Sequence, residues 1–410
     1  MDRRKFLIGA SAAALAPFAA RAAIPANDID WLVDQLAAHY AYLPDRHIDL
    51  AKLRALYRPQ AEAARDDHAM LGVLERLLAE LHDHHIELTT NNQDSPQLVP
   101  TGAEAWASFQ DGRAVIEAVR PGSSLERAGA KAGDVVTTIA GIPVREAVAR
   151  SAPRALSAPD PSADDYTLRV LLAGTHRARR VFAIQHASGA LQQLDLPPHQ
   201  PDPHVPPLTL SRIGSDIACI RVENSLGDSA LVRAFDDALA DVRSVPGLIL
   251  DLRNTPSGGN TDVAEPILGR FVRGRPGYQR VFQPGPGRTL ARDSYVRWVR
   301  ERGPFQFTGS LVVLCSRWTG SMGEGMTIGL DAMKRATIVG TRMAGLCGAT
   351  ERFALPNTDI GVQFPTERLY HLDGTPREKF VPPVLVELER ETSEDPILTR
   401  GIAILRKGRS

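Results

Sequence analysis

The sequence has few cysteines, no excess of charge of either sign and no long apolar run beyond its first 22 residues. Three cysteines in 410 residues are too few, and odd in number, for a disulfide framework. Lys and Arg number 48, as do Asp and Glu, which gives no electrostatic reason to expect nucleic acid or an anionic membrane as the main partner. No later stretch has the ~18 apolar residues of a membrane span. We therefore expect a soluble globular mature protein.

The first 22 residues have the pattern of an export signal. Arg3 and Arg4 precede a short apolar stretch and the small-residue sequence ARA, which ends at Ala22. This order is typical of a signal peptide, and the paired arginines before Lys-Phe-Leu resemble a twin-arginine signal. A general secretory signal is the alternative. The mature chain is expected to begin near Ala23 and to be periplasmic or secreted.

The patterning divides the mature chain into four segments. Residues 23–98 show apolar residues at helical spacing. Residues 99–195 show short strands separated by turns, and the sequence DYTLRVLLAG within them is predicted to be a strand. Residues 196–207 are a proline-rich linker. Residues 208–410 alternate strands with helices, which indicates an α/β domain built on crossover connections.

One serine stands where a buried strand is expected to give way to a helix. Ser321 follows the apolar sequence GSLVVLCS and lies among Gly320, Gly323 and Gly325, which let another part of the backbone approach closely. The free amides of a helix N-terminus stabilise developing negative charge. Ser321 to Glu324 also match the capping-box pattern, so a purely structural cap is the alternative.

A second glycine turn follows the other apolar strand, in the sequence DLRNTPSGGN. The amides of Gly258 and Gly259 can form a small anion nest there, although an ordinary strand-to-helix turn is the alternative. Because ligands bind at the carboxyl ends of strands in α/β sheets, we expect the two turns to share one pocket.

A serine nucleophile needs a base, which is usually histidine. The densest histidine cluster is HDHHIEL, with His82, His84 and His85. Solvated loop histidines and a metal site are the alternatives for this cluster. His371, in RLYHLDG, is the second candidate base.

In their order and spacing these motifs resemble the C-terminal processing and tricorn-type serine peptidases, family S41. LILDLRNTPSGGN resembles the family's Asp-Leu-Arg-Asn-x-x-Gly-Gly element, TGSMGE its nucleophile element, and LHDHHIEL its Asp-x-His-Thr element. VRPGSSLERAGAKAGDVVTTIAGIPV looks like the second half of a PDZ domain. The resemblance implies an α/β fold: a crotonase/ClpP-like core domain over 208–410, a PDZ-like β-rich domain over 99–195 and an N-terminal helical region over 23–98.

The resemblance also separates two catalytic styles. In one, a lysine 25 residues after the serine is the base, but here that position is Leu346, and Lys334 is expected to lie at a helix surface. The other style uses histidine, oriented by a distant glutamate. The sequence DGTPREKFVPP places that glutamate at Glu378, and His84 stands where the tricorn-type enzymes carry a serine that helps to orient the base.

The resemblance therefore implies hydrolysis of peptide or unfolded-protein substrates through an acyl-enzyme. Ser321 would be the nucleophile and His85 the base, active above about pH 6.5, with Glu378 as its orienting group. The Met322 amide and that of Gly258 or Gly259 would hold the oxyanion, and no metal or nucleotide is required. A non-catalytic member of the fold that binds peptides or apolar ligands is the alternative. The PDZ-like part has TGAEAWASF where a carboxylate-binding loop is expected, which favours a lid or packing module over a module that grips free C-termini.

Overall fold

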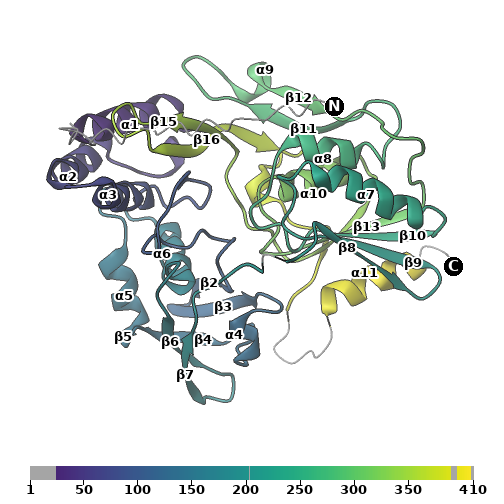
Figure 1. Ribbon diagram of the computed structural model, residues 1–410, viewed down its shortest axis with the longest axis horizontal. Coiled ribbons are helices and arrows are strands. Elements are labelled where there is room, and N and C mark those ends of the chain that lie inside the picture. Colours follow the sequence, from purple (N-terminus) through teal and green to yellow (C-terminus); the bar gives the residue numbers. More distant parts are fainter. Residues whose placement is uncertain (1–24, 203, 389–394, 408–410) are drawn as a thin grey trace, which may run out of the picture.

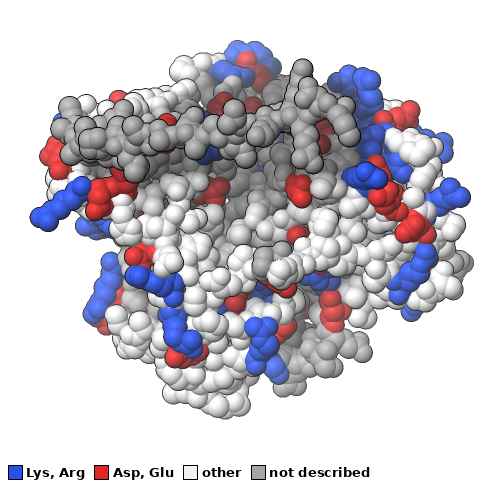
Figure 2. Space-filling view, in the orientation of Figure 1, with Lys and Arg blue, Asp and Glu red and all other residues white. Residues whose placement is uncertain are grey.

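The computed structural model describes residues 25–202, 204–388 and 395–407. The predicted export signal therefore lies outside the described residues. Figure 1 shows the helical N-terminal region at the upper left, a first sheet with its helices at the lower left and the α/β core at the right. None of the helices in the described ranges has the length and apolarity of a membrane span. Figure 2 shows basic and acidic side chains interspersed over one face, as the balanced charge leads one to expect.

The N-terminal region consists of three helices, namely α1 (Pro25–His39), α2 (Leu50–Ala63) and α3 (Asp67–Ala79). Asp49 and Asp66 cap α2 and α3 by accepting hydrogen bonds from backbone amides of the first turn. The apolar faces of the helices share one core with side chains of β15 (Ala349–Ala354) and β16 (Gly361–Tyr370), far along the chain. The helical region thus packs directly on the C-terminal part of the protein (Figure 1).

The middle of the chain forms a six-stranded sheet with the order β2-β3-β4-β6-β7 and with β5 paired to β4. Its strands are β2 (Ala105–Gln110), β3 (Arg113–Val119), β4 (Val135–Ile139), β5 (Ile142–Pro143), β6 (Arg180–Gln185) and β7 (Leu191–Leu196). The helices α4 (Ser124–Arg127), α5 (Val144–Ser151) and α6 (Pro161–Ala173) complete this region. Residues 197–202 and 204–207 then lead to the core without helix or strand.

The prediction of a strand in DYTLRVLLAG is wrong, because these residues belong to α6. Asp160 caps this helix by accepting from the amide of Ser162, and Pro161 occupies its first turn, where its missing N–H costs nothing. Leu168 and Leu172, one turn apart, are buried on the same face. The short apolar run is compatible with the residue spacing of a helix or of a strand. The helix-start signal before it, Asp160 followed by Pro161, favours the helix.

The core is a six-stranded sheet with the order β17-β14-β13-β10-β9-β8. All neighbours pair in parallel except β8 and β9. Its strands are β8 (Leu208–Ile213), β9 (Ile217–Val222), β10 (Gly247–Asp251), β13 (Ser310–Cys315), β14 (Thr337–Gly340) and β17 (Val384–Leu385). β10 is buried along its whole length, as a central parallel strand between two helical layers must be.

The remaining elements surround this sheet. The core helices are α7 (Ala230–Asp241), α8 (Thr261–Leu268), α9 (Leu290–Asp293), α10 (Met322–Ala332) and α11 (Pro396–Lys407). Two short 3-10 helices are η1 (Leu43–Asp45) and η2 (Arg377–Lys379). A third sheet has the order β1-β16-β11-β12, with β15 paired to β16, and contains β1 (Glu87–Leu88), β11 (Gly277–Phe282) and β12 (Tyr295–Trp298). The fold is therefore mixed α/β, as predicted.

Candidate active site

Two glycine-containing turns meet at the carboxyl ends of β10 and β13. These strands are parallel neighbours, so the segments that follow them leave the sheet side by side. Backbone hydrogen bonds join the two turns: the Thr255 amide donates to the carbonyl of Trp318 (3.1 Å), and the Gly320 amide donates to the carbonyl of Thr255 (3.1 Å). The structure thus brings together the two turns that the sequence places at one shared pocket.

Close packing between the turns explains why glycine stands at Gly258. A Cβ atom at this position would lie 2.3 Å from the Cβ of Ser321 and 3.0 Å from the Met322 nitrogen. The φ angle of Gly258 is +66°, a conformation that side chains disfavour. The absence of a side chain therefore lets the backbone of one turn lie against the serine of the other.

Ser321 stands at the start of α10 in a strained conformation. Its φ is 47° and its ψ is −109°, whereas a typical N-cap residue is extended. Such angles in a residue with a side chain cost of order 1–3 kcal/mol and cluster at functional sites. Glu324 forms its half of the predicted capping box by accepting a hydrogen bond from the Ser321 amide (2.9 Å). Ser321 is the last residue of the connection from β13 and directly precedes α10.

The imidazole of His85 lies against this hydroxyl. His85 Nε2 is 3.0 Å from Ser321 Oγ, and His85 Nδ1 is 2.5 Å from the carbonyl oxygen of Cys347. A carbonyl can only accept, so Nδ1 carries the proton and Nε2 presents its lone pair to the hydroxyl. This is the tautomer that a general base for Ser321 requires.

Strand pairing explains how a histidine from the helical region reaches the core. Directly after His85, β1 pairs antiparallel with β16, with Glu87 opposite Gln363 and Leu88 opposite Val362. The carboxylate of Asp83 accepts a hydrogen bond from the His85 amide (2.9 Å). These contacts fix the backbone on both sides of the imidazole.

Burial controls the charge of His85. It lowers the pKa of the imidazole to about 4, and the positive charge of Arg377 acts in the same direction. The hydrogen bond to the Cys347 carbonyl and the negative charge of Asp83 oppose this shift. The ring is therefore neutral at pH 7, as a base must be before it takes a proton.

The loop that carries Cys347 is held from two directions by buried charged groups. The Glu324 carboxylate accepts from the amides of Gly345 (2.9 Å) and Leu346 (3.1 Å) in addition to Ser321. Burial raises the pKa of Glu324 to about 7, although these amides and Arg377 act against the shift. Glu324 therefore links the serine turn to the loop that orients the base.

Arg377 holds the same loop through its carbonyl groups. Its Nη2 donates to the carbonyl oxygens of Leu346 (2.9 Å) and Gly348 (2.7 Å), which flank Cys347 in the chain. The side chain is buried. Sequence reasoning did not identify Arg377, the Cys347 carbonyl or the linking role of Glu324; the adjacent Glu378 was the one signal that pointed to this segment.

The structure differs from the expectation that Glu378 orients His85. The hydroxyl of Tyr42 donates to Glu378 Oε2 (3.4 Å), and the partner of His85 Nδ1 is the Cys347 carbonyl. The loop from Gly345 to Gly348 supplies a backbone acceptor at the place where the prediction put a carboxylate. Burial raises the pKa of Glu378.

Two backbone amides of the joined turns have no acceptor among the described residues. Met322 is the first residue of α10, so its amide makes no hydrogen bond within the helix. Of the two glycine amides, that of Gly258 donates to the Thr255 carbonyl (3.0 Å) and is occupied, whereas that of Gly259 has no such bond within the described ranges. Met322 and Gly259 thus provide the free donors.

The other candidate histidines have separate surroundings. His82 Nε2 lies 2.9 Å from an Asp160 carboxylate oxygen, and the His84 ring stacks on Tyr166. Because the three clustered histidines face different partners, they do not form a metal site together, and the described residues contain no group of three or more possible ligands. His371 lies 3.4 Å from Asp331, near the far end of α10 from Ser321, and so is not placed to act as its base.

The arrangement of this site does not fit the catalytic style in which a lysine is the general base. Leu346 is buried against Trp318, and Lys334 is exposed just beyond the C-terminal end of α10. The thiols of Cys219, Cys315 and Cys347 are buried and free, and burial raises the pKa of each. None of the three is a reactive thiolate.

A strained serine, a neutral imidazole in the correct tautomer and two free amides form a site that can carry out acyl transfer, the chemistry of serine hydrolases. Residues 216–384 match the model of peptidase family S41. This region holds both glycine turns, Ser321 and Glu324. This part of the chain is therefore similar to the serine-type peptidases of family S41.

Solved structures agree with the fold. The photosystem II D1 C-terminal processing protease is 19% identical, with a TM-score of 0.57 over 88% of this chain and 93% of that one. Mature CPAF is 14% identical, with a TM-score of 0.61 over 94% of this chain and 96% of that one. No curated protein sequence matches. At these identities the likeness establishes the arrangement of the chain and not the identity of a substrate.

Proposed function

We propose that this protein is a serine endopeptidase in which His85 takes the proton from Ser321 as the hydroxyl attacks a peptide carbonyl. The observation that carries the proposal is the contact of His85 Nε2 with Ser321 Oγ at 3.0 Å while Nδ1 is tied to a carbonyl. His85 then gives its proton to the leaving amine, and water hydrolyses the acyl-enzyme by the reverse use of the same groups.

The free amides of Met322 and Gly259 are proposed to hold the oxyanion that forms on the substrate carbonyl. They belong to the two joined turns, and each such donor lowers the barrier by roughly 3–4 kcal/mol. The Cys347 carbonyl orients the imidazole, and Arg377 and Glu324 position the loop that carries it.

The N-terminal pattern supports a protein that is exported, through a twin-arginine-like signal, to the periplasm or beyond. Peptides or unfolded proteins in that compartment are the proposed substrates. This part of the proposal is tested by fractionating cells that express the full chain and its Arg3→Lys, Arg4→Lys variant.

A fluorophosphonate probe and a peptide-hydrolysis assay test the catalytic proposal. We expect labelling at Ser321, and a fall in turnover of about 10⁶-fold in Ser321→Ala. Ser229→Ala, at an exposed serine before α7, is the matched control and should label normally. Absence of both labelling and hydrolysis in the folded wild type would instead favour the non-catalytic binding protein.

A further inference from the structure

A buried polar network joins the turn after α1, residues 40–46, to the segment that carries His85. The hydroxyl of Tyr40 donates to Asp83 Oδ2 (2.8 Å), and Arg46 Nε donates to the same phenol oxygen (3.2 Å). Arg46 Nη2 lies 3.5 Å from Asp83 Oδ2, and the side chains of Arg46 and Asp83 are only 16% and 2% exposed. The three side chains therefore form a closed network that is largely removed from solvent.

Each group has the protonation state that these bonds require. Burial and the negative charge of Asp83 raise the pKa of Tyr40 well above its ordinary value, so the phenol keeps its proton and donates. A guanidinium is always charged and has only donors. The second carboxylate oxygen of Asp83, Oδ1, accepts from the His85 amide (2.9 Å). Both oxygens of the buried carboxylate are thus hydrogen-bonded, and its charge is compensated by Arg46, as a buried charge requires.

Arg46 also reaches the loop that orients the base. Its Nη2 donates to Cys347 Sγ (3.2 Å), and the carbonyl oxygen of the same cysteine accepts from His85 Nδ1. Asp83, the other partner of Arg46, holds the backbone amide of His85. One guanidinium therefore contacts both residues that hold His85, the one that fixes its backbone and the one that fixes its ring.

The turn that carries Arg46 is itself fixed to β16. The Ala41 amide donates to the carbonyl of Pro365 (2.9 Å), and Arg368 Nε donates to the carbonyl of Ala41 (2.9 Å). β16 is also the strand with which β1 pairs directly after His85. The turn and the segment of the base thus share one support, which gives Arg46 a defined position relative to both.

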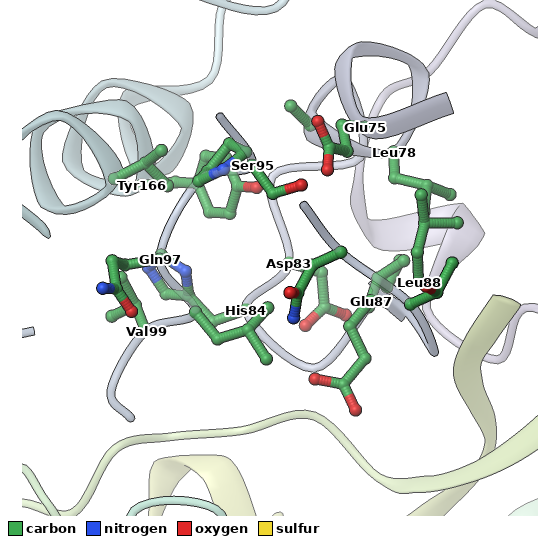
Figure 3. A pocket seen from close by; sticks show the side chains of 17 residues that line it. Glu75, Leu78, Asp83, His84, Glu87, Leu88, Ser95, Gln97, Val99 and Tyr166 are labelled. Atoms are coloured by element: carbon green, nitrogen blue, oxygen red, sulfur yellow. The ribbon is translucent and has the colours of Figure 1, made fainter. Parts of the chain in front are cut away.

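Packing does not enclose the segment of the base completely, because this segment borders a small cavity (Figure 3). The volume of the cavity is about 100 Å³, and its lining includes Asp83, His84, Ile86, Glu87 and Leu88. Side chains that face a void lose the contacts that would otherwise hold them in place. The polar contacts of Asp83 therefore have more to do in fixing this backbone than they would in a close-packed core.

We infer that Arg46 and Tyr40 are positioning residues of the proposed catalytic centre. They hold Asp83, which fixes the backbone of His85, and Arg46 also holds the loop whose carbonyl orients the ring. Neither residue touches the reacting atoms, so they act on the rate only through the placement of the base. A misplacement of a catalytic group by about 1 Å can cost about 10²-fold in rate. The inference rests on the proposed peptidase function.

The first test measures kcat and KM for peptide hydrolysis in Arg46→Lys and Tyr40→Phe. Arg46→Lys keeps the charge beside Asp83 and loses the fork that reaches Tyr40 and Cys347 together, so kcat should fall about tenfold or more. KM should change by less than about threefold, because the substrate is not contacted. Tyr40→Phe removes one hydrogen bond and should lower kcat in the same way but less. Arg54→Lys is the matched control, because Arg54 pairs with Asp30 and Asp34 in the same helical region and should leave both constants unchanged.

The second test reports the geometry of the base without a substrate. The Nδ1 proton of His85, held by the Cys347 carbonyl, should give a downfield proton NMR signal that is absent in His85→Ala. This signal should shift or broaden in Arg46→Lys and match the wild type in Arg54→Lys. Cys347→Ala keeps the carbonyl and removes the sulfur, so Arg46→Lys should lower kcat less in that background than in the wild type.

The outcomes separate this inference from the function on which it rests. An active wild type with an unchanged kcat in Arg46→Lys, or a lowered kcat with an unchanged His85 signal, overturns the positioning role and leaves the peptidase standing. No hydrolysis and no labelling of Ser321 in the folded wild type overturns both. Thermal unfolding shows whether each variant is folded, and if Arg46→Lys is not, the kcat and the His85 signal of Tyr40→Phe decide in the same way.

Discussion

The carbonyl oxygen of Cys347 and the hydroxyl of Ser321 bind opposite nitrogens of the same imidazole, that of His85. In many serine hydrolases a carboxylate takes the place that this carbonyl occupies, and its charge stabilises the imidazolium. A neutral carbonyl fixes the tautomer equally well but stabilises the charge less. The base should therefore be weak and should remain unprotonated in acid.

This geometry predicts an acid-tolerant enzyme. Because the pKa of His85 is lowered to about 4, the base stays neutral above that pH, and kcat/KM should lose half its value near pH 4 rather than near 6.5. This midpoint is lower than the one expected for an ordinary histidine. The measurement is the pH profile of kcat/KM with a peptide that has no ionisable groups.

The lowered pKa of His85 also makes the stability of the folded protein depend on pH. Between about pH 6.5 and 4 the unfolded chain binds a proton at His85 and the folded chain does not, so this group lowers stability as pH falls. Glu324, with a pKa raised to about 7, is the other buried group that titrates near the serine. If kcat/KM changes with pH near 7 and this change vanishes in Glu324→Gln, the titrating group is Glu324. If kcat/KM falls near pH 6.5 and this fall persists in the variant, the assignment for His85 is contradicted.

Arg377 should act as a positioning residue with an electrostatic signature. Arg377→Gln removes donors from the Leu346 and Gly348 carbonyls and a positive charge that lowers the pKa of His85. We expect kcat/KM to fall about 10–100-fold, equal to about 1.4–2.8 kcal/mol. The acid limb of the profile should also move upward.

Arg377→Lys is the matched control for charge. It keeps the positive charge and loses the forked donor, so its rate should fall while its acid limb stays in place. If the acid limb of the pH profile is the same in both variants as in the wild type, Arg377 positions the loop without affecting the pKa of His85.

Glu378 should matter less than the family pattern implies. Its carboxylate faces Tyr42 and not His85, and glutamine can still accept a hydrogen bond from that hydroxyl. We expect Glu378→Gln to keep kcat/KM within about tenfold, well short of the ~10⁴-fold loss seen when a triad carboxylate is removed. A loss of that larger size would restore Glu378 to the role of orienting group.

The parts of this site that the sequence could predict are those that depend on local signals. A serine between glycines after an apolar strand marks Ser321, and the Gly258–Gly259 pair marks the facing turn. His85 was selected from a local cluster and from the family pattern. Cys347 and Arg377 act through backbone contacts between segments far apart in the chain, and no local pattern distinguishes a carbonyl that will meet an imidazole.

The packing of Gly258 against Ser321 predicts that a single methyl group disrupts the site. Gly258→Ala combines a positive φ with a clash at 2.3 Å, so we expect loss of fluorophosphonate labelling and of about 1–3 kcal/mol in stability. Gly274→Ala is the control, because that glycine has nearly the same φ, +68°, and open space around its Cβ position. Equal effects in the two variants would show that φ alone matters.

The edge of β2 is closed to an added strand. The carboxylate of Asp165 on α6 accepts from the Phe109 amide (2.7 Å), and Arg169 Nε donates to the Ala107 carbonyl (2.9 Å). β2 lies at the end of its sheet, and its free backbone groups are those that a peptide would need to bind by strand addition. Side chains of α6 already occupy two of them, the Phe109 amide and the Ala107 carbonyl.

We therefore expect this sheet to have no preference for free C-termini. In calorimetric titrations with Ser321→Ala, matched peptides that end in a carboxylate or an amide should differ in Kd by less than about threefold, or about 0.6 kcal/mol. In the additional presence of Asp165→Ala and Arg169→Ala, which free the edge, binding of both peptides should tighten together. The opposite outcome is a preference of tenfold or more for the carboxylate peptide that is lost when Asp165 and Arg169 are replaced. It would show that α6 moves aside and that the edge of β2 is a recognition site.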